Sequence, residues 1–222
     1  MMKPQSLGRF LLPLAGCLSA TSLWAGVLDD LNASQKETVK SGKQLLITED
    51  IAGKPWPKVI VYQLVNATPE EVAAVFTDYK NAKVYTPNIL KSEVVQEISA
   101  TVKDIDYGVD VPILPDEYYT ARNTLTSPQK DTYRIEWKLL RAVQTKDSEG
   151  VLIIEPHGDQ ALMCYRNLVT PGSGMAGLLR SKAVSQMRDV VSALAARVEK
   201  EKASEPDLLA KQVKELRKNL GQ

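Results

Sequence analysis

The sequence predicts an α+β fold in which a run of antiparallel strands is followed by one long helix. Three observations predict it. Between residues 92 and 169, stretches of alternating apolar and polar residues are separated by turn sequences, as in an antiparallel meander. Before this meander, a helix-start signal directly follows a strand-like run. After it, apolar residues recur every three or four positions from Leu179 to Val198, which predicts an amphipathic helix.

Two strands are predicted at the start of the fold. The segment 58–66, K-V-I-V-Y-Q-L-V-N, is rich in the β-branched residues that favour strands. The segment 44–50 predicts a shorter strand before it, and the sequence G-K-P-W-P at 53–57 predicts the turn between them.

Thr68 is predicted to begin a short helix immediately after the second of these strands. Thr68 can cap the helix, Pro69 suits its first position, and Glu71 completes a capping box three residues after Thr68. The apolar stripe of this helix is expected to consist of Val72, Val75, Phe76 and Tyr79. The helix should end near residues 80–83, because Pro87 prevents a long continuation.

The meander is predicted to contain six strands, at residues 92–98, 101–111, 117–126, 132–140, 151–155 and 160–169. Its turns are expected at 127–130, 146–150 and 156–159. The clearest alternation is in 132–140, where Tyr133, Ile135, Trp137 and Leu139 share one face. In 117–126, either the face with Asn123 points inward, or the opposite face with Arg122 does.

The end of the chain is predicted to be helical. A glycine-rich break at 170–174 ends the strands, and the long helix then runs into residues 199–205, with Pro206 as a break. A second, more polar helix is expected at 207–220, so residues 202–222 form a polar helical extension.

Residues 1–25 are predicted to be a signal peptide. Lys3 and Arg9 precede an uncharged apolar run, which is too short for a membrane span. Cleavage is expected after Ala25, which predicts a periplasmic protein. The alternative is a bacterial lipoprotein, because L-A-G-C at 14–17 resembles a lipobox in which Cys17 would be acylated. An uncleaved anchor is the third alternative.

Composition limits the classes of function. The 222 residues are 44% hydrophobic and 25% charged, with a formal net charge of +1, so the chain carries no bulk charge for binding nucleic acid. Removing residues 1–25 would leave 26 of the 28 basic residues against 27 acidic ones. It would also leave Cys164 as the only cysteine, in an apolar stretch where a core position is expected.

The helix-start region resembles the START-like superfamily, also called SRPBCC. The resemblance lies in A-T-P-E-E-V at 67–72, F-T-D-Y at 76–79 and Y-T-P at 85–87. This superfamily includes START lipid-transfer domains, coenzyme-Q-binding proteins and polyketide cyclases. The resemblance implies a helix-grip fold over residues 44–201, preceded by a polar arm or helix at 26–43. In that fold a curved antiparallel sheet of about six or seven strands surrounds a long C-terminal helix, with two short helices after the first strand and an apolar cavity inside.

Residues that would carry catalysis are sparse. The single histidine, His157, lies in a predicted turn, and the sequence has no nucleophile, dinucleotide or P-loop motif. The period-two spacing of the carboxylates between Asp104 and Glu117 favours a solvated strand face. We therefore expect no catalytic residue, no metal and no cofactor.

The expected function is binding of a small hydrophobic molecule, lipid or isoprenoid, by an exported carrier or sensor, with transient membrane contact as a further expectation. The cavity candidates are Tyr107, Tyr119, Asn123, Arg122, Trp137 and Tyr165. Tyr79, Tyr85 and Pro87 are expected at the cavity mouth. The alternatives are a cyclase- or dehydratase-type enzyme that uses the same cavity, and a protein-interaction domain without a cavity.

Overall fold

The computed structural model describes residues 26–111, 114–172 and 176–222, with the side chains of 176–178 excluded. The expected signal peptide and Cys17 therefore lie outside the described residues. The chain begins with the short helices η1 (Val27–Asp30) and α1 (Ala33–Lys40), followed by the strands β1 (Leu45–Glu49) and β2 (Lys58–Val65). Three short helices come next: α2 (Pro69–Thr77), η2 (Tyr79–Asn81) and α3 (Ala82–Tyr85).

Six long strands and two helices complete the fold. The strands are β3 (Ile89–Glu97), β4 (Val102–Val109), β5 (Glu117–Gln129), β6 (Thr132–Ala142), β7 (Thr145–His157) and β8 (Gln160–Pro171). The helices are α4 (Ala176–Ser204) and α5 (Pro206–Leu220). The sheet of the described residues is antiparallel throughout and has the order β1-β2-β8-β7-β6-β5-β4-β3.

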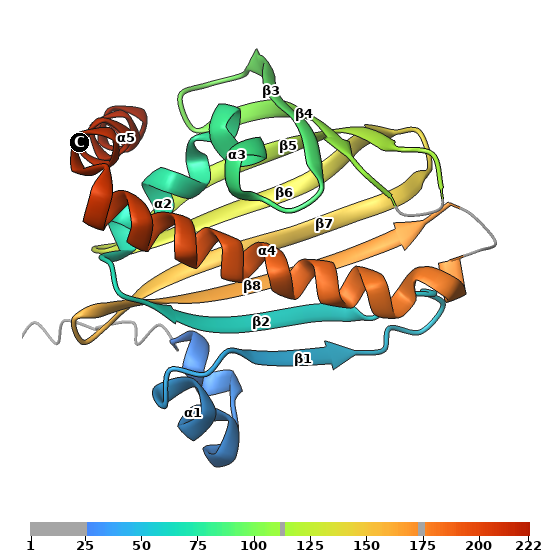
Figure 1. The fold of residues 1–222 in the computed structure, drawn as a ribbon, viewed down its shortest axis with the longest axis horizontal. Helices are drawn as coiled ribbons and strands as arrows, with labels where there is room; N and C mark the ends of the chain where they lie inside the picture. The colour runs from blue at the N-terminus through green and yellow to red at the C-terminus, as the bar shows by residue number, and fades with distance from the viewer. Residues whose placement is uncertain (1–25, 112–113, 173–175) are drawn as a thin grey trace, which may run out of the picture.

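Helix α4 lies across one face of this sheet, and α2 and α3 lie over the same face (Figure 1). The α+β helix-grip arrangement expected from the sequence is confirmed. The sheet has eight strands, which are the two early strands and the six meander strands expected from the sequence. This is one or two more than the six or seven that the family resemblance implies. The short helices consequently follow the second strand.

The start of α2 agrees with its sequence signal. Thr68 Oγ1 accepts a hydrogen bond from the Glu71 amide at 3.2 Å, and Glu71 Oε2 accepts one from the Thr68 amide at 2.7 Å. This reciprocal capping box satisfies two amides that have no partner within the helix. It fixes the point at which the chain leaves the sheet and turns over its inner face.

The sheet carries a hydrophobic core on each face. The larger core lies between the inner face and helices α2, α4 and α5, and it includes Ile135, Leu152 and Val191. The smaller core lies on the outer face, where the segment of η1 and α1 covers β2 and β8. Residues 26–43 are thus a short helical layer with buried Val27, Leu31 and Val39. Cys164 belongs to this outer core and is fully buried.

Some local expectations are wrong for reasons of tertiary structure. Residues 146–150 were expected to form a turn, but they lie within β7, and the chain turns at Val143 and Gln144 instead. Of the carboxylates expected on a solvated face, Asp104 is 4% exposed and Glu117 is 7% exposed. Asp104 is buried because Arg122 covers it, with Nε 2.8 Å from Asp104 Oδ1.

Candidate ligand-binding cavity

Four residues from four neighbouring strands lie in one row on the inner face of the sheet. Asn123 of β5 is paired with Trp137 of β6, Trp137 with Gly150 of β7, and Gly150 with Asn167 of β8. Side chains that are opposite each other in adjacent strands share a face of the sheet. The row therefore places two amide side chains on either side of an indole.

Gly150 makes the space in which the Trp137 indole lies. A Cβ atom at position 150 would be 2.2 Å from Trp137 Cζ2 and 2.5 Å from the carbonyl oxygen of Arg166, well inside van der Waals contact. The indole extends over Gly150 to β8, where Trp137 Nε1 donates a hydrogen bond to Asn167 Oδ1 at 3.2 Å. The absence of a side chain at 150 thus permits the contact between Trp137 and Asn167.

Aromatic rings continue this wall in both directions. The ring centroids of Trp137 and Tyr165 are 5.0 Å apart, and those of Phe76 and Trp137 are 6.4 Å apart. The rings of Tyr107 and Tyr119 are stacked, with centroids 5.2 Å apart. Aromatic pairs at these distances attract one another and hold the rings in fixed orientations.

The rings and amides line an inner cavity of about 220 Å³ between the sheet and the helices. It is closed from the helical side by residues of α2, η2, α3 and α4. The residues that line it are Phe76, Tyr79, Ala82, Tyr85, Thr86, Ile89, Tyr107, Tyr119, Ala121, Asn123, Trp137, Leu139, Thr145, Ser148, Tyr165, Asn167, Val169 and Val190.

A second, outer pocket of about 240 Å³ adjoins the inner cavity at the N-terminal half of α4. The two share wall residues, among them Ile89, Tyr119 and Val190. Pro87, Leu179 and Met187 line the outer pocket only. The outer pocket also borders two charged residues, Glu117 and Lys182, whereas the described lining of the inner cavity contains only uncharged side chains.

Burial controls the acid–base behaviour of the cavity. Removal from water raises the pKa of Tyr79, Tyr107, Tyr119 and Tyr165 above the ordinary tyrosine value, since an uncharged environment disfavours phenolate. Burial also raises the pKa of Tyr85. The cavity is therefore apolar in its walls and carries neutral hydroxyls.

The structure assembles most of the sequence candidates around this cavity. Tyr107, Tyr119, Asn123, Trp137 and Tyr165 all line it. Arg122 lies on the opposite face of β5, because adjacent residues of a strand point to opposite faces, and its guanidinium is paired with Asp104. Asn123, which is 3% exposed, therefore faces the inner cavity, and Arg122 does not.

The three residues expected at the mouth are divided between the two pockets. Tyr79 is 7% exposed and lines the inner cavity together with Tyr85. Pro87 is exposed and borders the outer pocket. Sequence reasoning also missed Gly150 and Asn167. Asn167 had a usable signal, since it is an amide on the same strand face as Tyr165, but Gly150 had the composition of a turn.

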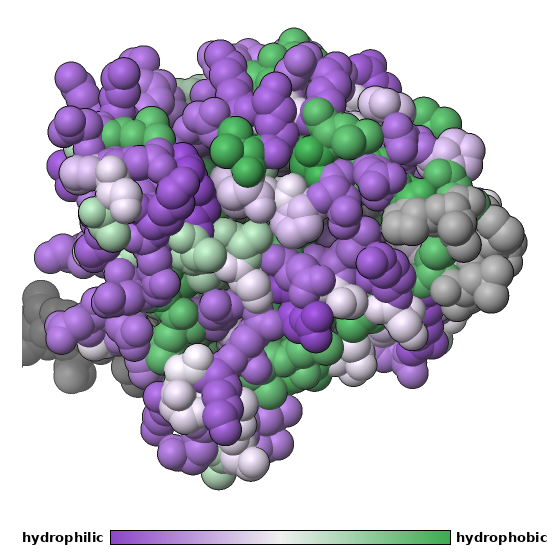
Figure 2. Space-filling model, in the orientation of Figure 1, coloured by the Kyte–Doolittle hydropathy of each residue, from purple (hydrophilic) through white to green (hydrophobic). Residues whose placement is uncertain are grey.

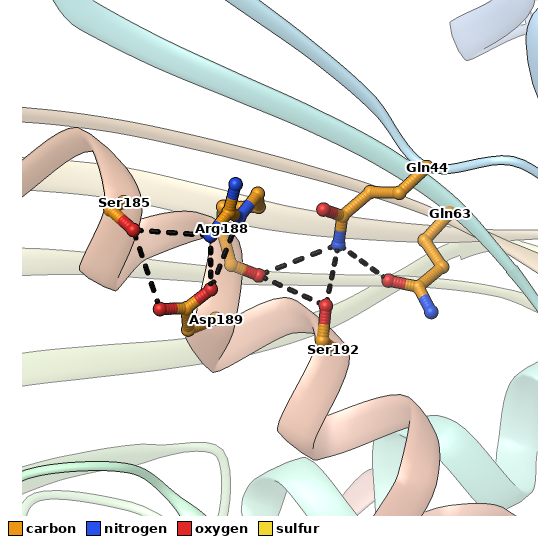
Figure 3. A network of polar contacts seen from close by, with 6 residues as sticks. All are labelled: Gln44, Gln63, Ser185, Arg188, Asp189 and Ser192. Atoms are coloured by element: carbon orange, nitrogen blue, oxygen red, sulfur yellow. Dashed lines mark hydrogen bonds and ion pairs between the residues drawn. The ribbon is translucent and has the colours of Figure 1, made fainter.

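A polar network anchors α4 over the cavity (Figure 3). Gln44 Nε2 donates to Gln63 Oε1 at 2.7 Å and to Ser192 Oγ at 2.9 Å, which joins the start of β1 and the inner face of β2 to the middle of α4. One turn earlier in the helix, Arg188 and Asp189 form an ion pair at 2.9 Å. The contacts of Gln44 thus connect the sheet to the part of α4 that presents Val190 to the cavity.

The exterior over α4 differs from this interior. The face shown in Figure 2 is largely hydrophilic, and hydrophobic residues show there as separate groups. None of the described helices is both long enough and apolar enough to cross a membrane. The described residues also contain no cluster of three or more histidine, cysteine, aspartate or glutamate side chains suited to a metal ion.

A curved antiparallel sheet that grips a long helix over an internal cavity is the START-like, or SRPBCC, helix-grip fold. No family model and no curated protein matches this chain. Solved structures, in contrast, do match it. The STAR-related lipid transfer protein from Xanthomonas axonopodis is 14% identical, with a TM-score of 0.64 over 70% of this chain and 93% of that one.

Two further structures support the same fold. Human STARD10 is 13% identical, with a TM-score of 0.57 over 85% of this chain and 87% of that one. The Zhui aromatase/cyclase from Streptomyces sp. R1128 is 18% identical, with a TM-score of 0.54 over 67% of this chain and 96% of that one. The chain therefore has a START-like fold, which agrees with the resemblance of its helix-start region.

Proposed function

We propose that this protein binds one small hydrophobic molecule in the inner cavity, as a carrier or sensor. The observation that carries the proposal is the uncharged, aromatic lining of a cavity between the sheet and α4. Small-molecule sites have this character: mostly apolar walls with a few placed polar groups. A likeness in fold to a lipid transfer protein is consistent with it.

The test is to purify the full chain from cells and examine it by native mass spectrometry and organic extraction. We expect an apolar compound at close to one per chain. The variant Ala121→Leu fills the cavity, because Ala121 lines it and is 3% exposed. Val190→Phe does the same from α4. Thr124→Leu is the matched control, since Thr124 lies on the same strand and lines the outer face of the sheet.

Retention lost in both cavity variants and kept in Thr124→Leu would support the proposal. Chains that are folded and purify without any apolar compound, or that retain it equally in all four proteins, would contradict it. Circular dichroism and the unfolding midpoint establish that each variant is folded.

The alternative, a cyclase- or dehydratase-type enzyme, has less support. Such an enzyme requires an acid that donates a proton to a carbonyl oxygen near neutral pH. Burial raises the pKa of Tyr107, Tyr119 and Tyr165, which makes these hydroxyls weaker proton donors. We therefore favour binding over catalysis.

We also propose export with cleavage after Ala25. The cleavage would create a positively charged amino group at Gly26. The Gly26 nitrogen lies 3.0 Å from Asp29 Oδ2, and the adjacent Val27 amide donates to Glu155 Oε2 at 3.0 Å. Two carboxylates near the new terminus would stabilise its charge. N-terminal sequencing of protein from the periplasm tests this: Gly26 supports cleavage, and an acylated Cys17 supports the lipoprotein alternative.

A further inference from the structure

We infer that the inner cavity selects a flat ring that carries a neutral oxygen substituent, and that Asn123 and Asn167 recognise this substituent. The inference rests on the proposed binding function and specifies the chemical class of its ligand. It depends on the orientation of the two amides, the rings between them and the absence of charge in the described lining.

The orientation of the Asn167 amide follows from its partner. The indole Nε1 of Trp137 can only donate, so the Asn167 atom 3.2 Å away accepts and is Oδ1. The Asn167 Nδ2 group is then left with two N–H donors and has no partner among the described residues. Asn167 is 8% exposed and lines the inner cavity.

The Asn123 amide is oriented by the same reasoning. It lies 3.2 Å from the carbonyl oxygen of Ala121, which can only accept, so the contacting atom is Nδ2. The Asn123 Oδ1 atom is left as an acceptor without a partner in the described part of the chain. The row across the sheet thus offers one free acceptor and one free donor on either side of the Trp137 indole.

Polar groups that are removed from bulk water cost free energy unless they form hydrogen bonds. A ligand hydroxyl both donates and accepts, and a carbonyl accepts, so either can use this row. An ionised head group has no counter-charge among the described residues that line the inner cavity. Burying it there would be strongly unfavourable.

The rings define the shape of the ligand between the amides. Trp137 and Tyr165 are inclined by 31° with centroids 5.0 Å apart, and the Phe76 ring centroid lies 6.4 Å from that of the indole. A flat unsaturated ring gains contact with such faces beyond its apolar area, whereas a saturated chain does not. We therefore expect a conjugated ring with a hydroxyl or carbonyl to bind more tightly than an alkyl chain or an anion.

Four probes on one ring skeleton test this by titration calorimetry at pH 7: 2-naphthol, naphthalene, decahydro-2-naphthol and 2-naphthoate. For the wild-type chain, 2-naphthol should bind about five- to tenfold more tightly than naphthalene, the effect of about one hydrogen bond. It should also bind about three- to tenfold more tightly than decahydro-2-naphthol. 2-Naphthoate should bind most weakly.

The variants Asn123→Leu and Asn167→Leu should reduce the preference for 2-naphthol over naphthalene to less than about twofold while naphthalene still binds. Trp137→Phe keeps an aromatic ring but removes the donor that orients Asn167, so it should reduce the same ratio. The control is Thr124→Leu, because Thr124 follows Asn123 in β5 and lies on the outer face of the sheet. The ratio of the two affinities in this variant should equal that of wild type.

An unchanged ratio in both asparagine variants would overturn the inference, as would tight binding of 2-naphthoate or failure of all the ring probes to bind the wild-type chain. A protein that retains an extracted alkyl compound but binds no ring probe keeps the proposed function and loses this inference. A protein that retains no apolar compound and binds no ring probe would contradict both the proposed function and this inference.

Discussion

The indole of Trp137 lies against Gly150 so closely that a Cβ atom at position 150 would come within 2.2 Å of Trp137 Cζ2. This contact connects β6 and β7 and allows the indole to reach Asn167 on β8. A glycine inside a strand weakens the strand itself, so its presence here indicates a close approach by another group. The cavity wall therefore requires glycine at position 150 as well as the aromatic rings.

We predict that Gly150→Ala lowers the free energy of unfolding by about 1–3 kcal/mol, because the methyl group overpacks the site. Urea unfolding measures the loss, and near-ultraviolet circular dichroism should show that Trp137 has moved. The double variant Gly150→Ala/Trp137→Leu should recover part of the stability, though not all, since the Arg166 carbonyl oxygen lies 2.5 Å from the added Cβ. Wild-type stability together with an unchanged spectrum would contradict the prediction.

Asn123→Leu is predicted to stabilise the protein. The wild-type Asn123 is 3% exposed, and its Oδ1 has no partner among the described residues. Leucine has a similar volume, and it removes the unpaired Oδ1 together with the 3.2 Å hydrogen bond to the Ala121 carbonyl oxygen. We expect the first effect to exceed the second, so that urea unfolding shows a rise of about 0.5–1.5 kcal/mol in the free energy of unfolding. A gain in stability with a loss of ligand selectivity is expected of a residue that is kept for function. Destabilisation by Asn123→Leu would instead indicate a structural role for the amide.

The elements of the fold could be predicted because their signals are local. The capping box of Thr68 and Glu71 lies within four residues, and the alternation of β6 from Tyr133 to Leu139 lies within seven. The residues that form such a pattern also form the contacts that it predicts, so no distant part of the chain is needed. The aromatic cavity candidates were likewise found from the alternation of residues within the predicted strands.

The site was less predictable because its polar row depends on strand register. Gly150 is paired with Trp137 and Asn167, which are 30 residues apart in the sequence. In the sequence alone, Gly150 ends a K-D-S-E-G run that has the composition of a turn. The burial of Asp104 likewise depends on Arg122, which is 18 residues away. Local patterns contain no information about either pairing.

Glu117 explains why the chain turns at Val143 and Gln144. Its carboxylate accepts hydrogen bonds from both amides, with Oε1 at 3.0 and 3.1 Å, and Oε2 accepts one from Thr145 Oγ1 at 3.0 Å. We predict that Glu117→Ala lowers the free energy of unfolding by about 2–4 kcal/mol, because these donors lose a buried charged partner. Hydrogen exchange at residues 143–145 should accelerate. Asp116→Ala, the adjacent carboxylate, should change neither quantity appreciably.

Glu201 is the most buried carboxylate in the described part of the chain, at 1% exposure. Arg197 Nε donates to its Oε1 at 2.6 Å, while Oε2 has no partner among the described residues. Gln212 of α5 donates weakly to the same Oε1, at 3.5 Å, and more strongly to Asp78 at 2.9 Å. Burial raises the pKa of Glu201, and Arg197 opposes this shift only in part.

The direction of this shift predicts the pH dependence of stability. Because the folded pKa of Glu201 is higher than the unfolded one, its stabilising contribution is complete below the unfolded pKa and is lost as pH rises through the folded value. Asp106 and Glu205 have lowered pKa values, so their contributions change in the opposite direction. The measurement is therefore a difference: the free energy of unfolding of Glu201→Gln minus that of wild type, from pH 4 to pH 8. We expect this difference to rise with pH, because glutamine cannot ionise in the buried site. A difference that stays constant or falls across this range would show that Arg197 fully compensates the buried charge.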